Sequence, residues 1–257
     1  MTAVTTTVRA TGRRVRLEQL CFWRHRQMAF FTFLLPVALL VLLGEMNGHN
    51  RYQGVHVIDW EVPGLLAFGL ISATYTNLAI NVTSLRETGI LKRLRATPLS
   101  ARTFVLGQIG SSLLVAGYLT TIFVIAARAL FGVSVPLSHV PAVLITLLVG
   151  AACFCALGLA VTIPIRSAEA ASPIVQATYI PLALVSGVFF TPDTGGPVLR
   201  AVTGALPLRP LAAALDACFA HGAPGGGWRP ADLAVMAAWG AAGAVMAWRA
   251  FRWTPSH

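Results

Sequence analysis

Charged residues are scarce in this chain. Aspartate, glutamate, lysine and arginine together make up 11% of its 257 residues, whereas hydrophobic residues make up 56%. An ordinary soluble domain carries about 25% charged residues, because a chain of this size has a large surface that must face water. The low charge content therefore excludes an ordinary soluble domain and predicts an integral membrane protein.

Lysine is almost absent, since Lys92 is the only one in the chain. An ATP-binding loop of the P-loop type needs a Gly-Lys-Ser or Gly-Lys-Thr sequence, but Lys92 follows Leu91 and precedes Arg93. We therefore expect no such ATP site and no cofactor in this chain. The arginines lie mostly beside apolar segments, which favours a membrane protein over a nucleic-acid-binding protein.

Common catalytic motifs are also missing, because the chain contains neither His-Glu-x-x-His nor Gly-x-Ser-x-Gly. The four cysteines lack the spacing of a metal or redox site. His49 and His56 lie near Asp59 and Glu61, but exposed loop residues of these types are usually solvated, so we expect no metal site. No apolar segment carries a charge near its centre, which argues against proton-coupled transport. A membrane enzyme and a secondary antiporter are therefore disfavoured.

Long apolar segments are what the chain does contain. A helix that crosses a bilayer needs about 20 apolar residues, and six segments approach or exceed this length. We therefore predict an all-α, polytopic fold with six transmembrane helices in a single membrane domain over residues 1–257. The predicted spans are Met28–Leu43, Pro63–Val82, Phe104–Ala127, Val140–Ile163, Ala170–Phe190 and Asp232–Phe251.

The distribution of basic residues predicts the orientation of these spans. If the N-terminus is cytoplasmic, most of the lysine and arginine residues lie in the inner segments and most of the acidic residues lie in the outer ones. This asymmetry follows the positive-inside rule. It predicts a multi-pass protein of the plasma membrane with both termini in the cytoplasm.

Two segments of mixed polarity flank the spans. Residues 1–27 are predicted to be a cytoplasmic N-terminus with an amphipathic interface helix over Arg13–Gln27, and a plain basic flank is the alternative. Residues 191–230 form the longest outer connection. Their apolar-rich pieces predict short helices that re-enter the outer leaflet before the last span, because backbone at that depth must be paired.

The most polar stretch inside the chain is residues 84–100, on the predicted cytoplasmic side. Ser84 and Glu87 have the spacing of a capping box, which predicts that a helix begins there. Gly89 would break or bend this helix, and Pro98 would end it. The residues alone support a short docking helix and a plain basic loop equally. In the docking helix, one face would hold Ile90, Leu91 and Leu94, and the opposite face would hold Lys92 and Arg95.

Residues Glu87–Leu99, which read Glu-Thr-Gly-Ile-Leu-Lys-Arg-Leu-Arg-Ala-Thr-Pro-Leu, resemble the signature of type-2 ATP-binding-cassette permeases, the daunorubicin-resistance-like exporters. The family pattern is approximately Glu-x-Gly-Thr-Leu-x-x-Leu-Arg-Ala-Thr-Pro-Leu, and this chain departs from it mainly at Ile90. Residues Leu184–Phe190 are similar to the family's Ser-Gly-x-Phe-Phe element, and Leu206–Leu208 to its Leu-Pro element. The six-span layout agrees with the resemblance from end to end.

The resemblance implies a cytoplasmic coupling helix within the hairpin 84–100. This helix would bind a groove of a separate ATPase subunit, present in two copies, which would hold ATP and Mg²⁺. It also implies a second permease, which is a second copy of this chain in a homodimer or, as the alternative, a similar permease in a heterodimer. The implied coupling residues are Glu87, Gly89, Leu91, Arg93, Leu94, Arg95 and Pro98, with Glu87 and Arg95 forming charge pairs with the ATPase.

Uncharged polar residues occur inside several spans. At lipid depth such residues usually face protein or a cavity, so they either bond between helices or line a path for an amphipathic molecule. By resemblance, the second and fifth helices of two protomers would face each other along that path. The candidate path residues are Thr74, Asn77, Asn81, Gln176, Tyr179, Ser186 and Phe189.

These inferences together predict the membrane subunit of an exporter that performs no chemistry itself. Its expected cargo is a hydrophobic drug, antibiotic or lipid-like compound, and its expected surroundings are membrane lipid. Export of a polysaccharide or glycolipid is the alternative within the family. A membrane enzyme or a scaffold is the alternative outside it.

Overall fold

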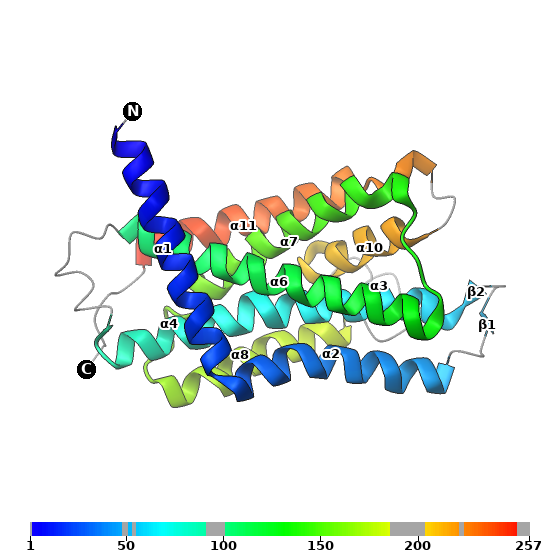
Figure 1. Cartoon of the computed structure of the whole chain (residues 1–257), viewed down its shortest axis with the longest axis horizontal. Coiled ribbons are helices and arrows are strands. Elements are labelled where there is room, and N and C mark those ends of the chain that lie inside the picture. Colours follow the sequence, from blue (N-terminus) through cyan, green and yellow to red (C-terminus); the bar gives the residue numbers. More distant parts are fainter. Residues whose placement is uncertain are drawn as a thin grey trace.

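The computed structural model describes residues 2–47, 51–52, 55–90, 101–185, 204–220 and 224–250. They form an elongated bundle of helices, with one pair of two-residue antiparallel strands at one end (Figure 1). In chain order the elements are α1 (Thr2–Arg24), α2 (Arg26–Asn47), β1 (Arg51–Tyr52), β2 (Val55–His56), α3 (Val57–Ile71), the π-helical turn η1 (Ser72–Thr76), α4 (Asn77–Glu87), α6 (Ala101–Phe131), η2 (Leu137–His139), α7 (Val140–Val161), α8 (Ala168–Val185), α10 (Leu208–Phe219), η3 (Pro224–Gly227) and α11 (Pro230–Ala250).

Within the described residues, five helical stretches are long and apolar enough to cross a membrane. They confirm a polytopic all-α fold, and they correspond to five of the six predicted spans. The remaining prediction, Ala170–Phe190, overlaps α8, which is not among the five; residues 186–190 lie outside the described part. The five stretches are Ala29–Asn47, Val57–Glu87, Thr103–Phe131, Leu137–Val161 and Gly225–Arg249.

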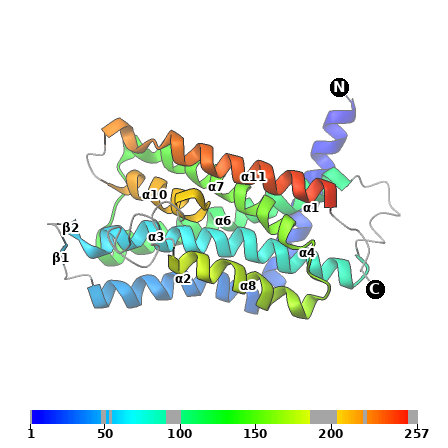
Figure 2. The same ribbon diagram turned by 180° about the vertical axis from the view of Figure 1, so that it is seen from behind.

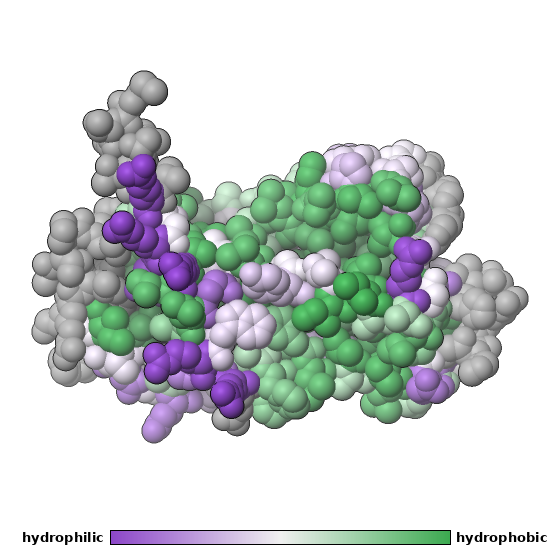
Figure 3. All heavy atoms as spheres, in the orientation of Figure 1, coloured by the Kyte–Doolittle hydropathy of each residue, from purple (hydrophilic) through white to green (hydrophobic). Residues whose placement is uncertain are grey.

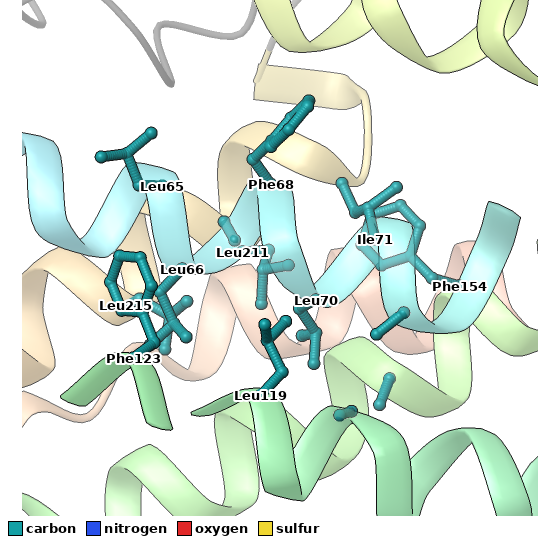
Figure 4. Close-up of a cluster of buried hydrophobic side chains, with 14 of the residues drawn as sticks. Leu65, Leu66, Phe68, Leu70, Ile71, Leu119, Phe123, Phe154, Leu211 and Leu215 are labelled. Atoms are coloured by element: carbon teal, nitrogen blue, oxygen red, sulfur yellow. The ribbon is translucent and has the colours of Figure 1, made fainter. Parts of the chain in front are cut away.

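One of these stretches, Val57–Glu87, is the central element of the bundle. Within its apolar 18-residue segment, 72% of the residues are buried. The corresponding segments of Ala29–Asn47 and Gly225–Arg249 are only 28% and 17% buried. A helix that is apolar on all sides belongs in the interior of a bundle. Figure 4 shows its side chains packed against residues of α6, α7 and α10. The fully buried core includes Leu65, Leu66, Leu70, Ile71, Leu119, Phe123, Leu211 and Leu215.

The central helix contains one wide turn, η1, between α3 and α4. Thr74 Oγ1 donates a hydrogen bond to the carbonyl oxygen of Leu70 at 2.6 Å. Gly158 of α7 lies against this turn, because a Cβ atom at Gly158 would be 2.9 Å from the carbonyl oxygen of Tyr75. The glycine therefore allows the backbones of α7 and η1 to approach each other closely.

The two ends of the bundle differ in what they carry. Figures 1 and 2 show α1, the end of α4, the turn between α7 and α8 and the end of α11 at one end. The strands β1 and β2, together with η2 and η3, lie at the other end. Figure 3 shows a broad hydrophobic surface between them, with hydrophilic residues gathered along α1. We call the end that carries α1 the inner end.

Helix α10 lies inside the outer half of the bundle, where it packs against α3, α7 and α11. It covers Leu208–Phe219 and is a short helix within the segment 191–230, where short helices were predicted. One face of α10 is buried, including Leu208, Leu211 and Leu215. Because residues 186–203 lie outside the described part, the rest of the predicted re-entrant connection stays a prediction.

Candidate coupling and transport site

The predicted coupling residues are only partly within the described structure. Glu87 and Gly89 are described, whereas Leu91, Arg93, Leu94, Arg95 and Pro98 lie outside the described residues. Glu87 ends a continuous helical stretch of 31 residues. At 1.5 Å per residue this stretch is about 46 Å long, which exceeds the hydrocarbon thickness of about 30 Å. A helix of this length extends beyond the hydrocarbon layer, and Glu87 marks its inner end.

The capping box predicted at Ser84 and Glu87 is wrong. Helix α4 runs unbroken from Asn77 to Glu87, so Ser84 lies in its last turn and not at the start of a new helix. The carbonyl oxygen of Ser84 accepts hydrogen bonds from Thr88 N at 3.0 Å and from Thr88 Oγ1 at 2.8 Å. The local signal failed because a helix that is already formed continues through these residues.

Gly89 ends α4, as its position in the sequence predicted. Its φ angle is +70°, which is in the left-handed region that glycine adopts most easily. Its amide donates a hydrogen bond to the carbonyl oxygen of Arg86 at 3.2 Å. A left-handed glycine of this kind is a common helix C-terminal signal.

Glu87 has a partner inside the chain. Its carboxylate accepts a hydrogen bond from the backbone amide of Ala168, the first residue of α8. The side chain is exposed, so it lies at the rim of the turn that connects α7 and α8. The predicted charge pair between Glu87 and an ATPase stays a prediction.

Sequence reasoning missed the role of Arg86, which it counted only as a cytoplasmic positive charge. Arg86 is 5% exposed. Its Nη1 donates to the carbonyl oxygen of Thr162 at 3.0 Å, and its Nη2 donates to the carbonyl oxygen of Ile165. These partners are 76 and 79 residues away in sequence, so no local pattern could have identified them.

A second polar cluster joins α1 to the central helix and to α6. Glu18 is 6% exposed and forms an ion pair with Arg14. Asn81 Nδ2 lies 3.1 Å from Glu18 Oε2 and 3.1 Å from Gln108 Oε1, so the amide group bridges the two. Gln19 Nε2 also donates to Ser111 of α6 at 2.9 Å. These contacts hold α1 against the bundle, which the sequence did not predict.

Two leucines of the predicted amphipathic helix Arg13–Gln27 face away from the bundle. Leu17 and Leu20 are 54% and 53% exposed, whereas Phe22 is buried and makes an edge-to-face contact with Phe33 of α2 at 6.0 Å. Helix α1 therefore directs a polar cluster and Phe22 inward, and leucines outward. Leucines on the outer face are the arrangement of a helix at a membrane interface.

The candidate path residues of the central helix separate into two groups. Thr74 is fully buried and bonded to its own helix, so its hydroxyl is not available to line a path. Asn77 and Asn81 line a cavity of about 340 Å³ between α1, α4 and α6. We call this the inner cavity. Its lining also includes Ser84, Thr88 and Gln108, so several polar side chains meet in this cavity among apolar ones.

Tyr179 of α8 lines a second cavity, of about 320 Å³, which we call the apolar cavity. The hydroxyl groups of Tyr75 and Thr178 lie 2.8 Å apart at its wall and link η1 to α8. Gln176 is exposed and donates to Ser172 Oγ at 2.8 Å, so it belongs to neither cavity. Ser186 and Phe189 lie outside the described residues. The lining of the apolar cavity also includes Ile71, Phe154, Leu157, Leu182, Trp239 and Met246.

Two further observations concern the titratable groups. Among the described residues, no group of three or more histidine, cysteine, aspartate or glutamate side chains could hold a metal ion. On α10, burial raises the pKa of Asp216 above its ordinary value, and the charge of Arg229 opposes this shift. Burial thus disfavours the charged form of the Asp216 carboxyl group.

Comparison with known proteins gives one match. The family model described as ABC-2 type transporter matches residues 13–219. The matched range includes both polar clusters of the inner end and most of the lining of both cavities. A comparison with curated proteins found no match.

Proposed function

The chain belongs to the family of ABC-2 type transporters, and from this premise we propose that it is the membrane permease of an exporter for hydrophobic drugs, antibiotics or lipid-like compounds. Permeases of this family work with a separate ATPase subunit. In the proposed assembly two copies of this chain pair as a homodimer with two ATPase subunits, which hold ATP and Mg²⁺. The assembly lies in the plasma membrane with its inner end in the cytoplasm.

The observation that carries this proposal is that one helix joins the candidate docking end to the apolar cavity. The stretch Val57–Glu87 contributes Ile71 and Tyr75 to the cavity wall and ends at Glu87 on the inner end. Because this stretch is helical throughout, a displacement applied at its end is transmitted along it. The coupling segment Glu87–Leu99 would receive that displacement from the ATPase.

The lining of the apolar cavity supports a hydrophobic cargo. Its wall is made mainly of aliphatic and aromatic side chains, with hydroxyl groups at Tyr75, Thr178 and Tyr179. Sites for small molecules usually have volumes of about 300–1,000 Å³ and this balance of apolar and polar groups. A polysaccharide carries many hydroxyl groups and would need many more polar partners, so the alternative cargo is less well supported.

Copurification tests the assembly. The full-length chain, extracted from membranes with a mild detergent, should bring down an ATP-binding-cassette ATPase in a one-to-one ratio. Membranes that yield the permease with no stoichiometric ATPase would overturn the proposal. The same preparation should also be reconstituted in liposomes, with ATP supplied on the side of the membrane that faces the inner end. It should then transport rhodamine 6G, a hydrophobic dye, to the opposite side.

A substitution in the docking segment tests the coupling. Leu91→Asp places a charge on the predicted docking face, so transport should fall at least tenfold while the permease still inserts. Leu137→Asp is the matched control, because Leu137 is 91% exposed at the other end of the bundle, and it should leave transport within twofold of wild type. Normal transport by Leu91→Asp at normal expression would contradict the docking face.

A further inference from the structure

Two consecutive residues of opposite charge meet the same turn at the inner end. Arg86 donates to the carbonyl oxygens of Thr162 and Ile165, which follow the end of α7. Glu87 accepts from the amide of Ala168, where α8 begins. Figure 2 shows α8 beside α4 at this end, and the two helices are in contact. The end of α4 is therefore bonded to both sides of the α7–α8 turn.

Each of the two charges matches the helix end that it meets. The last carbonyl groups of a helix lack intrahelical partners and carry partial negative charge, which suits a guanidinium group. The first amide groups carry partial positive charge, which suits a carboxylate. Arg86 and Glu87 thus cap α7 and α8 from a third helix.

Burial distinguishes the two caps. Arg86, Thr162 and Ile165 are 5%, 0% and 1% exposed, so the arginine contact is shielded from water. A buried guanidinium that loses its acceptors has no replacement for them, which makes this contact costly to break. Glu87 lies at the exposed rim of the turn and adds a bond that can be removed by substitution without opening the core.

We propose that Arg86 and Glu87 are positioning residues that make the end of α4 and the α7–α8 turn a single mechanical unit. A displacement delivered to the end of α4 then moves the start of α8 directly. Helix α8 carries Thr178 and Tyr179, which form one side of the apolar cavity, while α7 and α11 form the other side. The proposal rests on the proposed function for the source of the displacement. It gives Glu87 a role within the permease.

Hydrogen–deuterium exchange of the permease alone tests the link without any ATPase. In Glu87→Ala the amide of Ala168 loses its acceptor, so exchange of the peptide that begins α8 should become about tenfold faster, as expected for one charge-assisted hydrogen bond. Glu87→Gln keeps a carbonyl acceptor and should lie between Glu87→Ala and wild type. Glu169→Ala is the matched control, because Glu169 is in the same turn and, in the described part of the chain, makes no hydrogen bond with α4. Unchanged exchange in Glu87→Ala would overturn the proposal.

Reconstituted complexes test what the link does. Glu87→Cys should export rhodamine 6G at least tenfold more slowly than the wild type at equal expression. Adding Ala168→Cys places a second cysteine at the lost contact. In the fraction of the protein where mass spectrometry finds the 87–168 disulfide, transport should return under oxidising conditions and fall again on reduction. Loss of transport that the disulfide does not restore would place Glu87 at the ATPase surface and would overturn the proposal.

The exchange measurement and the transport measurement together distinguish failure of this inference from failure of the proposed function. A wild-type complex that does not export rhodamine 6G counts against the proposed function, whereas the exchange measurement still decides whether the cap exists. A wild-type complex that exports the dye and is unaffected by Glu87→Cys counts against the inference alone.

Discussion

Replacing Glu18 by alanine should release α1 from the bundle. Glu18 forms an ion pair with Arg14 and accepts a hydrogen bond from Asn81 Nδ2 at 3.1 Å. Its removal leaves a guanidinium whose side chain is 12% exposed without its counter-ion. Breaking a buried ion pair by removing one partner typically costs about 3–5 kcal/mol.

The lower end of that range is appropriate for Glu18. The Arg14 guanidinium also lies over the Phe104 ring at 5.0 Å, and that contact survives the substitution. Two donors of the cluster, Arg14 Nε and Gln108 Nε2, are buried without hydrogen-bond partners, which reduces what the intact cluster contributes. We therefore expect α1 to lose about 3 kcal/mol of attachment, equivalent to about a hundredfold in an opening equilibrium.

Hydrogen–deuterium exchange of the peptide covering residues 9–24 measures this effect, since α1 packs chiefly on α6 and can open without the rest of the bundle. Exchange should rise about a hundredfold in Glu18→Ala and be unchanged in Glu45→Ala, an exposed acid on α2. The double variant Arg14→Met/Glu18→Leu replaces the pair by apolar groups, which is often nearly neutral, and should recover most of the loss. If residues 9–24 exchange as fast in the double variant as in Glu18→Ala, the reasoning is refuted.

The remaining predictions concern packing and charge elsewhere in the bundle. Gly158→Ala should lower the free energy of unfolding by about 1–3 kcal/mol, because the new Cβ would lie 2.9 Å from the carbonyl oxygen of Tyr75. Gly117→Ala is the control and should not lower it, because Gly117 has open space around it. Equal melting temperatures for the two variants would contradict this prediction. Burial raises the pKa of Asp216, so its ionisation disfavours the fold as pH rises through the folded-state pKa. Asp216→Asn should therefore raise the melting temperature more at neutral than at mildly acidic pH, and the opposite trend would show that the Arg229 attraction dominates.

The sequence predicted the spans because bilayer thickness sets the length of an apolar run. The prediction Val140–Ile163 compares with an observed Leu137–Val161, and Met28–Leu43 with Ala29–Asn47. The bounds of the central span were much too short, since the sequence predicted Pro63–Val82 where the helix extends over Val57–Glu87. Polar residues at its outer end were interpreted as loop, and those at its inner end as the start of a separate hairpin, although one helical stretch continues through both.

The candidate site was less predictable because its contacts join distant parts of the chain. Asn77 and Asn81 line the inner cavity beside α1, whereas Tyr179, predicted for the same path, lines a different cavity. Glu18 is buried, and its hydrogen-bond partner Asn81 lies 63 residues away in the sequence. Periodicity reports which residues share a face, but it does not report which helix that face will meet.

The wide turn η1 determines which direction the side chains of α4 face relative to those of α3. A π-helical turn holds an extra residue, and each residue of an α-helix turns the chain by about 100°. If the same residues formed a regular α-helix without this wide turn, everything after Thr76 would be rotated by about 100° relative to α3. Asn81 would then turn away from Glu18 while Arg86 turned away from Thr162. Both inner-end contacts therefore depend on a wide turn deep in the bundle, and a substitution that converts η1 into regular α-helix would weaken both.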